Sequence, residues 1–518
     1  MALSERAANQ SQTGAGSRKL VIQLARLGDF LQTTPLLAAL GKPDLLVTPA
    51  QAPLAQACRH RGRVMILDPA TLEDAAESGE PGRLRLARLQ GMLGPIWREP
   101  IAEIYNLNLS ALCASLAAGW PRARLHGWHW QDGKLAGESW SSFMMGMVAD
   151  RRLTRLHLSD ILASYAKPAG PPLERLDHRV EQTARERAVN SLPPGRPLVA
   201  LQLGANNDLR RWPIASFAAL AQELMAQGAG IVLVGSSRER ILGRRLQREL
   251  GPAGERVCDL MGSTDLTTLA AVLEASDLIV SADTGTLHLA TAVGGRGARG
   301  GRVLALYMGP AQAHETGPYG RGHLVLQARD QCGPCQENAP SCQGQAPCRK
   351  IITPQIAQKA CLNLLQGSSA RGAARNLDLP AGLEALAGEL DGFGQRYIRL
   401  TPQPLSTGEG LALALREAGR ILLRPDYEYE QSLIAQELES EFEPPSEAAR
   451  QELHALARAA GRLRLAAEAG DGAALKRVLA DAPGLKALGN AALQEKPAGL
   501  SQACRAASAV LEMSAGIK

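Results

Sequence analysis

Short apolar runs and helical patterns alternate along residues 19–366. Lys19–Ala25 and Leu198–Leu203 each have the length of a strand, and each leads through a polar turn into a helical pattern. Residues 30–40 predict one such helix, with Pro35 in the early turns, where a proline costs least. Further strands are expected at 45–47, 64–67, 103–107, 231–234, 278–280 and 303–310. This alternation predicts an α/β fold of parallel sheets with helices on both faces.

Two segments rich in Pro and Gly, 167–172 and 192–197, divide this part of the chain. They predict two Rossmann-like domains, at 18–170 and at 193–366. Residues 1–17 are rich in Ser, Gln, Gly and Ala, and we expect them to be disordered. Two such domains would hold a ligand in the cleft between them, beyond the carboxyl ends of the strands.

Composition narrows the class of protein. The chain has 518 residues, 45% of them hydrophobic, and a formal net charge of +6. This excess suits phosphorylated ligands or an anionic membrane surface, but it is too diffuse to indicate nucleic acid. No apolar run approaches the length of about 18 residues that a transmembrane helix needs, and the first residues lack the apolar core of a signal peptide. We therefore expect a cytoplasmic location.

The tail at 376–518 is rich in Ala, Leu, Glu and Arg. Helical periodicity at 447–468 and 472–480 predicts a helical extension. Three roles are open for it: binding of an acceptor, oligomerisation, or packing against the core.

The stretch Ser281–Ala290 follows the apolar run 278–280 and starts a new helical pattern. Asp283 and the residues after it predict a tight turn, in which Gly285 lets the backbone come close to a ligand. The free N–H groups at the start of the helix would face an anion favourably. An ordinary capping turn is the alternative.

Five motifs in order resemble glycosyltransferase family 9, the ADP-heptose:lipopolysaccharide heptosyltransferases and their relatives. The resemblance covers about residues 19–365. It implies a GT-B fold, in which a first, acceptor domain and a second, donor-nucleotide domain face a cleft, and transfer without a catalytic metal and with inversion at the anomeric carbon. The motifs are Arg26-Leu27-Gly28-Asp29 with Thr34-Pro35, Arg210-Arg211-Trp212-Pro213, Leu260 to Leu266, Ser281 to His288, and Gly309-Pro310.

The resemblance implies two catalytic residues. Asp29 matches the base that takes a proton from the acceptor hydroxyl. Its alternative role is to cap the helix expected at Phe30. Arg210 lies where the family usually has Lys, and it would steady the departing diphosphate; plain solvation at the surface is the alternative.

The donor-binding residues that the resemblance implies have separate roles. Thr284, Gly285 and Thr286 match a diphosphate-binding turn, Asp283 a contact to the donor sugar, and His288 a residue near the phosphates. Glu239 matches a glutamate at the ribose, Met261 lies where adenine would bind, and Gly28 belongs to the turn before the base. For His288 a satisfied buried histidine, and for Glu239 a helix-surface glutamate, are the alternatives.

A cysteine cluster lies in the loop 332–348. Cys332, Cys335, Cys342 and Cys348 could close a tetrahedral thiolate site for structural zinc or iron. Reduced or redox-active thiols are the alternative. No cofactor is expected to be required for the transfer itself.

Together these features predict transfer of heptose from ADP-L-glycero-D-manno-heptose to a saccharide of the lipopolysaccharide core, with the protein peripheral on the inner membrane. One alternative keeps the reaction and makes a protein serine or threonine the acceptor. Another is a nucleotide-sugar-binding or scaffold protein without turnover.

Overall fold

The chain divides into two compact units. The first unit comprises Met1–Glu138, Leu162–Gly170 and Asp177–Arg179; the second comprises Ser139–Ile161, Pro171–Leu176 and Val180–Lys518. A computed structural model describes residues 18–70, 82–138, 141–166, 172–193, 196–294, 301–329, 334–336, 342, 346–428, 430–494 and 499–517. The expected disorder of residues 1–17 lies outside these ranges. Within them, no helix has both the length and the apolar character needed to cross a bilayer.

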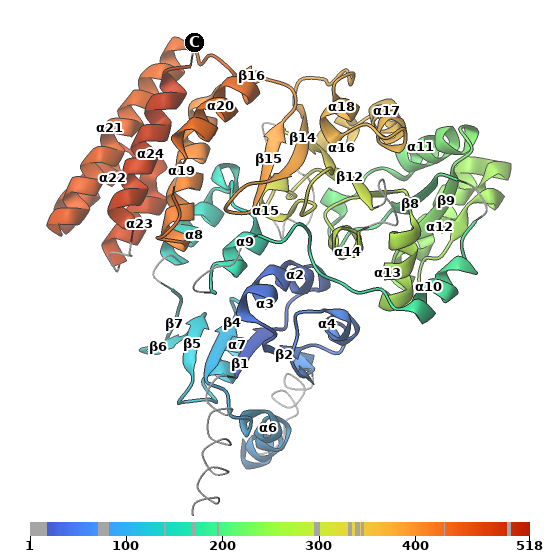
Figure 1. Ribbon diagram of the computed structural model, residues 1–518, viewed down its shortest axis with the longest axis horizontal. Coiled ribbons are helices and arrows are strands. Elements are labelled where there is room, and N and C mark those ends of the chain that lie inside the picture. Colours follow the sequence, from blue (N-terminus) through green and yellow to red (C-terminus); the bar gives the residue numbers. More distant parts are fainter. Residues whose placement is uncertain are drawn as a thin grey trace, which may run out of the picture. The chain divides into compact units, whose positions relative to one another are not determined.

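The first unit is built on a parallel sheet with strand order β3-β2-β1-β4-β5 (Figure 1). Its strands are β1 (Lys19–Gln23), β2 (Asp44–Val47), β3 (Val64–Ile66), β4 (Glu103–Asn106) and β5 (Arg124–Gly127), and a hairpin of β6 (His129–Gln131) and β7 (Lys134–Ala136) follows. Its helices are α2 (Leu27–Gln32), α3 (Thr34–Leu40), α4 (Ala52–Ala57), α6 (Gly82–Trp97) and α7 (Ala111–Ala117). Apolar residues of β1, β4 and α7 form its core.

The second unit contains an eight-stranded sheet with order β10-β9-β8-β11-β12-β13-β14-β15. The strands are β8 (Leu198–Gln202), β9 (Gly230–Val234), β10 (Cys258–Asp259), β11 (Leu278–Ser281), β12 (Arg302–Tyr307), β13 (Leu324–Ala328), β14 (Leu383–Leu390) and β15 (Gln395–Arg399). Strands β8 to β13 are parallel in the Rossmann order, whereas β14 and β15 are antiparallel additions at one edge.

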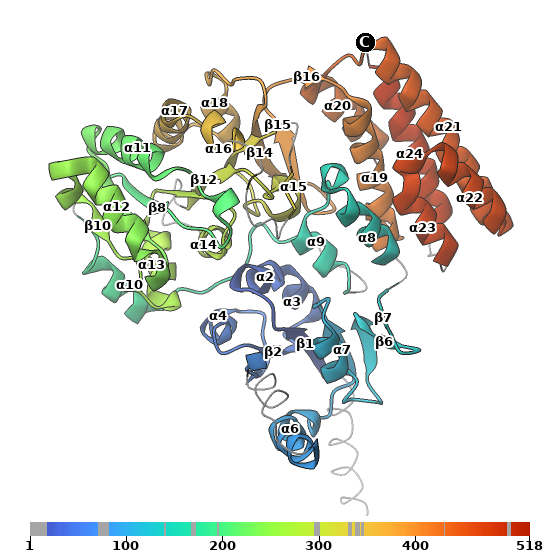
Figure 2. The ribbon, with the colours of Figure 1, turned by 180° about the vertical axis from the view of Figure 1, so that it is seen from behind.

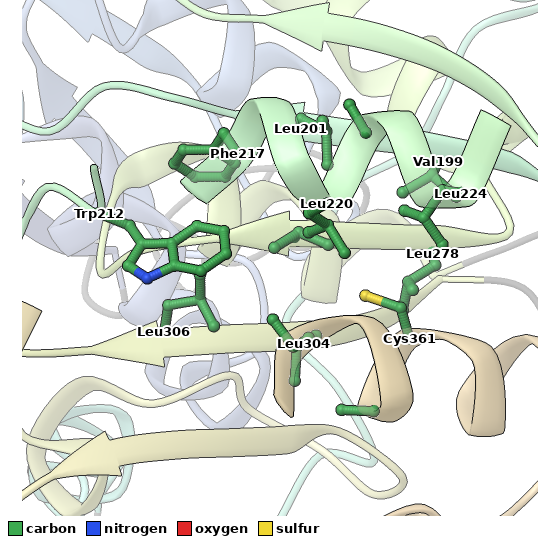
Figure 3. Packing of buried hydrophobic residues seen from close by; sticks show 14 of the residues in the cluster. Val199, Leu201, Trp212, Phe217, Leu220, Leu224, Leu278, Leu304, Leu306 and Cys361 are labelled. Atoms are coloured by element: carbon green, nitrogen blue, oxygen red, sulfur yellow. The ribbon is translucent and has the colours of Figure 1, made fainter. Parts of the chain in front are cut away.

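Helix α11 (Ile214–Ala226) covers one face of this sheet. Figure 3 shows its Phe217, Leu220 and Leu224 among Trp212, strand leucines and Cys361 of α17 (Pro354–Leu365). The Trp212 ring is 1% exposed and its Nε1–H donates to Ile352 O at 2.8 Å. The other helices of this part are α10 (Gln182–Val189), α12 (Arg240–Leu250), α13 (Leu266–Ala275), α14 (Gly285–Val293), α15 (Ala313–Thr316), α16 (Cys348–Ile351), α18 (Ala370–Ala374) and the 3-10 turns η2 (Asp208–Arg210), η3 (Ser237–Glu239) and η4 (Gly251–Arg256).

The C-terminal part is a helical extension, as the sequence predicts, but the helices begin only at Thr407. They are α19 (Thr407–Leu423), α20 (Gln431–Glu441), α21 (Glu447–Ala469), α22 (Gly472–Asp481), α23 (Lys486–Gln494) and α24 (Leu500–Ala515), with the short elements β16 (Gln403–Pro404), β17 (Phe442–Glu443) and η5 (Pro483–Leu485). In both Figure 1 and Figure 2 helices α21 to α24 lie side by side. Residues 410–423 of α19 are all buried, so this helix is a core element.

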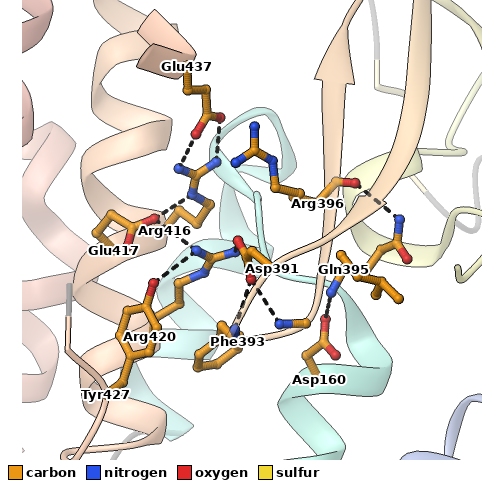
Figure 4. A network of polar contacts seen from close by, with 12 residues as sticks. Asp160, Asp391, Phe393, Gln395, Arg396, Arg416, Glu417, Arg420, Tyr427 and Glu437 are labelled. Atoms are coloured by element: carbon orange, nitrogen blue, oxygen red, sulfur yellow. Dashed lines mark hydrogen bonds and ion pairs between the residues drawn. The ribbon is translucent and has the colours of Figure 1, made fainter. Parts of the chain in front are cut away.

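Buried ion pairs tie α19 to its surroundings. Figure 4 shows Arg416 of α19 bonded to Glu437 of α20 (2.6 and 2.7 Å) and to Glu417 (2.7 Å). One turn further, Arg420 bonds Asp391, in the turn between β14 and β15, at 2.7 Å. The pair of Arg420 and Asp391 therefore joins the extension to the eight-stranded sheet, and the Arg420 side chain is only 4% exposed.

The segment α8 (Ser141–Ala149), η1 (Arg151–Leu153) and the first residues of α9 (Leu158–Ala163) belongs to the second unit. The sequence assigns everything in 18–170 to the first domain, and the structure differs here. The reason is a set of long-range contacts, such as the ion pair of Arg155 with Glu409, 254 residues along the chain. Gly146 of α8 also packs against Ala487 of α23, where a Cβ atom would lie 2.7 Å from Ala487 Cα.

Candidate active site

Asp29 lies at the carboxyl edge of the first sheet. The chain leaves β1, crosses residues 24–26 and enters α2, where Asp29 is the third residue. Its Oδ2 accepts a hydrogen bond from Arg26 N–H at 3.0 Å, and its carboxylate is partly exposed. Asp29 thus caps a helix, although that helix starts at Leu27 instead of Phe30. Capping fixes the direction of the carboxylate and is compatible with a role as base.

Asp283 lies at the carboxyl end of β11 in the second unit. Its Oδ2 is 3.0 Å from Arg210 Nη1, and its Oδ1 is 3.7 Å from His288 Nε2. All three side chains are nearly buried, with exposed fractions of 7% for Asp283, 12% for Arg210 and 4% for His288. Burial alone would raise the pKa of Asp283, but the hydrogen bond from His288 and the charge of Arg210 outweigh it and hold the pKa below its usual range. Asp283 is therefore an ionised acceptor at neutral pH.

Helix α14 begins directly after this carboxylate. Thr284 is its N-cap residue, and the Thr284 side chain makes no capping bond but lies 3.2 Å from Ser281 Oγ. The first bonded amides are those of Leu287 and His288, both to Thr284 O at 3.1 and 3.4 Å. The N–H groups of Gly285 and Thr286 precede them at the helix start, where an anion is favoured.

Glu239 lies over the ends of β8 and β9. Its Oε2 accepts bonds from Ser236 N–H (2.7 Å) and Ser236 Oγ–H (2.8 Å). A Cβ atom on Gly204 would come within 1.5 Å of Glu239 Oε1, so a larger residue there would displace this carboxylate. The glutamate is therefore held at the carboxyl edge of the sheet.

Met261 is a core residue at the same edge. It is 1% exposed, and a Cβ atom on Gly235 would lie 2.8 Å from Met261 Cε. Arg240 fixes the loop by donating from Nε to Met261 O (3.0 Å) and from Nη2 to Gly262 O (2.8 Å). The contact of Met261 with adenine stays a prediction.

The structure brings the sequence-predicted residues of the second unit into two groups. Arg210, Asp283, His288 and the 284–286 turn form one group, and Glu239 and Met261 meet at Gly235 in the other. Both lie along the carboxyl edge of β9, β8 and β11, where the strand order reverses between β8 and β11. Such a switch point is where α/β sheets bind ligands. Gly28 lies on α2 of the first unit.

Thr316 and His157 lie near Asp283 and are not predicted from the sequence. The Thr316 hydroxyl bonds Asp283, and Tyr307 of β12 donates to Thr316 O at 2.7 Å. His157 donates from Nε2 to Gly317 O at 3.1 Å, and burial lowers its pKa to about 3, so the ring is neutral. No local motif marks either residue, because each reaches the site from a distant part of the chain.

The cysteine cluster falls partly outside the described residues. Cys332 lies outside them, whereas Cys335, Cys342 and Cys348 are half-buried. The Cys335 N–H bonds Gly309 O at 3.2 Å, which joins this loop to the end of β12. Among the described residues, no group of three His, Cys, Asp or Glu side chains could hold a metal ion. A zinc or iron site therefore stays a prediction.

Part of the chain resembles known glycosyltransferases. Residues 104–345 match the family model of glycosyltransferase family 9 (heptosyltransferase). The resemblance to family 9 is confirmed.

The chain is 29% identical over 165 residues to lipooligosaccharide heptosyltransferase 2 of Haemophilus ducreyi, a match covering 31% of this chain and 46% of that protein. It is 31% identical over 138 residues to lipopolysaccharide heptosyltransferase 2 of Salmonella typhimurium, covering 26% of this chain and 38% of that protein. The matched part is thus less than half the length of either heptosyltransferase.

Solved structures of the family share the fold. The ADP-heptose lipopolysaccharide heptosyltransferase II of Escherichia coli has a TM-score of 0.51 at 19% identity, and the comparison covers 67% of this chain and 98% of that one. A family 9 glycosyltransferase from Veillonella parvula has a TM-score of 0.50 at 17% identity, covering 68% of this chain and 97% of that one. The fold is therefore GT-B, with two Rossmann-like domains and, in this chain, a helical extension.

Proposed function

We propose that this protein is an inverting glycosyltransferase that moves heptose from ADP-L-glycero-D-manno-heptose to a saccharide of the lipopolysaccharide core. The observation that carries the proposal is the ion-paired Asp283 at the start of α14, at the switch point of the second sheet. The match to the family 9 (heptosyltransferase) model and the names of the relatives support heptose as the sugar. ADP as the nucleotide is what the resemblance to the family implies.

The second unit would bind the donor. An ionised Asp283 accepts hydrogen bonds from sugar hydroxyls, and the amides of Gly285 and Thr286 with Arg210 meet the negative diphosphate. Glu239 would accept a bond from the ribose. Charge builds up on the diphosphate as the bond to the anomeric carbon breaks, and these groups are in place before that step, so they cost no rearrangement.

The first unit would supply the base. In the proposed step Asp29 takes the proton of the acceptor hydroxyl, the acceptor oxygen bonds to the anomeric carbon, and ADP leaves with the electron pair of the broken bond. Attack opposite to the leaving group inverts the anomeric carbon. Proton nuclear magnetic resonance of the product distinguishes inversion from retention.

The acceptor is the broadest part of the proposal. A lipopolysaccharide core is anchored in a membrane, and a net charge of +6 suits approach to an anionic surface, so we propose a peripheral location on the inner membrane. A protein serine or threonine is a second candidate acceptor. It is favoured by the helical extension, which lies C-terminal to the matched residues 104–345.

Ligand binding to the purified protein is the test of the donor. Titration with ADP-heptose, ADP, UDP and GDP should show preference for the adenine ligands. Asp283→Ala should weaken binding of ADP-heptose. The matched control is Asp277→Ala, which removes a carboxylate at the opposite end of the same strand, where it accepts Leu198 N–H at 2.7 Å. Preference for UDP or GDP would overturn the heptosyltransferase assignment, and no binding at all would favour the scaffold alternative.

A further inference from the structure

The backbone that leads into the Asp29 helix is held by side chains at every step. The N–H groups of residues 24, 25 and 26 donate in turn to Asn108 Oδ1 (3.0 Å), Gln23 Oε1 (3.2 Å) and Asp29 Oδ2 (3.0 Å). A connection between a strand and a helix usually gives such groups to water. Here two carboxamides and the carboxylate itself accept them, so the path of the chain toward Asp29 is fixed.

Gln51 holds the carbonyl side of the same connection. It lies just before α4 and is completely buried. Its Nε2 donates to Ala25 O at 3.0 Å and to Arg26 O at 3.3 Å. Its Oε1 accepts bonds from Thr48 N–H (2.9 Å) and Thr48 Oγ–H (3.1 Å), which orient the carboxamide.

Asn108 holds the strand end from the other side. Its Nδ2 donates to Ile22 O at 2.8 Å and to Asn106 Oδ1 at 3.1 Å. Asn106 in turn donates to Trp128 O at 2.7 Å, beyond β5. The carboxamide of Asn108 therefore links the ends of β1 and β4, the two strands between which the order of the first sheet reverses.

A third chain of bonds reaches Asp29 itself. Gln23 donates from Nε2 to Thr33 Oγ1 at 3.1 Å, and Thr33 donates to Asp29 O at 2.8 Å. The carboxamides of this cluster are neutral, so they fix the turn without placing a charge beside the carboxylate that has to take a proton. A buried Lys or Arg could hold the same carbonyls, but it would favour the ionised carboxylate and weaken it as a base.

We propose that Gln51 and Asn108 are positioning residues for Asp29: they hold residues 24–26, and with them the carboxylate, in the direction that proton transfer requires. This inference rests on the proposed function of Asp29 as base. Neither residue touches a substrate in this scheme, and both act on the rate through Asp29.

The first test is Gln51→Leu, which keeps the size of the side chain and removes both bonds to the connection. We expect kcat to fall about 10- to 100-fold, because a misplacement of about 1 Å can cost that much, while KM for the donor changes less than about twofold. Gln51→Glu keeps the oxygen that Thr48 bonds and loses the donor, so it should lose kcat as well. The matched control is Gln395→Leu, which removes a buried carboxamide of the second unit whose Oε1 accepts Gly320 N–H at 2.7 Å; it should lower Tm and keep kcat.

A double variant shows whether Gln51 acts through the base. If it does, Asp29→Ala with Gln51→Leu should have the residual rate of Asp29→Ala alone to within about twofold, since effects on one shared group do not add. If the two rate losses multiply in the double variant, the inference is overturned and the role of Asp29 stays intact. A full rate for Asp29→Ala would instead overturn the proposed function.

Hydrogen exchange gives a readout that needs no activity. Amides of residues 24–26 should exchange slowly in the wild type and in Gln395→Leu, and at least about tenfold faster in Gln51→Leu and Asn108→Ala, with the strands of the first sheet unchanged. Unchanged exchange at 24–26 would refute the positioning role. Faster exchange over the whole first unit would show that Gln51 and Asn108 serve general stability only.

Discussion

The buried pair of Arg416 and Glu437 offers a sharp test of how the extension is held. Both side chains are about 5% exposed, and the guanidinium bonds both carboxylate oxygens, at 2.6 and 2.7 Å (Figure 4). Burial alone would raise the pKa of Glu437, but the charge and hydrogen bonds of Arg416 hold it below its usual range. Glu437→Gln keeps the shape and removes the negative charge, so Arg416 is left with Glu417 as its acidic partner in this group at 2.7 Å.

Breaking a buried pair costs about 3–5 kcal/mol, and we expect the lower end because Glu417 remains. At about 2–4 °C per kcal/mol, the thermal midpoint of the transition that includes α19 and α20 should fall by roughly 6–12 °C. The double variant Arg416→Met with Glu437→Leu should lose less stability than Glu437→Gln. In the double variant both charges are gone, so folding no longer has to desolvate them.

The assay is thermal unfolding followed by circular dichroism, with limited proteolysis to assign the transition to the extension. Glu468→Gln is the control, because Glu468 forms an exposed pair with Arg464 on α21 and should leave the midpoint unchanged. A midpoint for Glu437→Gln within about 2 °C of the wild type, less than 1 kcal/mol by the same conversion, would refute the reasoning. So would a double variant less stable than the single one.

Three further predictions concern the base, the pH response and the cysteines. Asp29→Ala should bind ADP-heptose with wild-type affinity in calorimetry and lose transfer; a near-normal rate would remove Asp29 from the mechanism. Burial raises the pKa of Asp160 to about 7, so between about pH 4 and 7 the folded protein holds a proton that the unfolded chain has released, and stability should fall as pH rises through this window. In Asp160→Asn, thermal midpoints measured between about pH 4 and 7 should fall less steeply with pH than in the wild type. An unchanged slope would contradict the raised pKa of Asp160. Elemental analysis of anaerobically purified protein tests the cysteine cluster: about one zinc or iron per chain would support a four-cysteine site, and less than about half an equivalent would count against it.

The strands of both Rossmann-like sheets are largely predictable from the sequence, because each is a short apolar run between turn signals. The helix expected at 30–40 is in fact two, α2 and α3, separated at Thr33. Pro35 explains the break, because it has no N–H to donate and its ring would clash with the carbonyl of Leu31. Thr34 fills that gap by donating its hydroxyl to Leu31 O at 2.7 Å.

Strand β14, by contrast, cannot be predicted from its sequence. Its sequence, Leu383 to Leu390, is made of Leu, Glu, Ala and Gly and lacks the β-branched and aromatic residues that favour strands. Pairing with β13 and burial decide its conformation, and neither can be read from the local pattern. The proximity of Asp283 and His288 can be predicted from the sequence, because they lie on one turn and the helix that follows it. The positions of Thr316 and His157 cannot be predicted in this way, since only the fold brings them near Asp283.

The two antiparallel strands also determine where this protein can be shortened. Leu324, Val325 and Leu326 of β13 are completely buried, and β14 lies along their outer side. A version ending near residue 366, where the family resemblance stops, would present β13 as an open apolar edge, and such edges recruit strands from other molecules. It would also lose Glu384, the partner of Arg329 at 2.7 Å. The shortened protein should therefore be recovered as aggregates, so the end of the recognisable family sequence is a poor place to cut this chain.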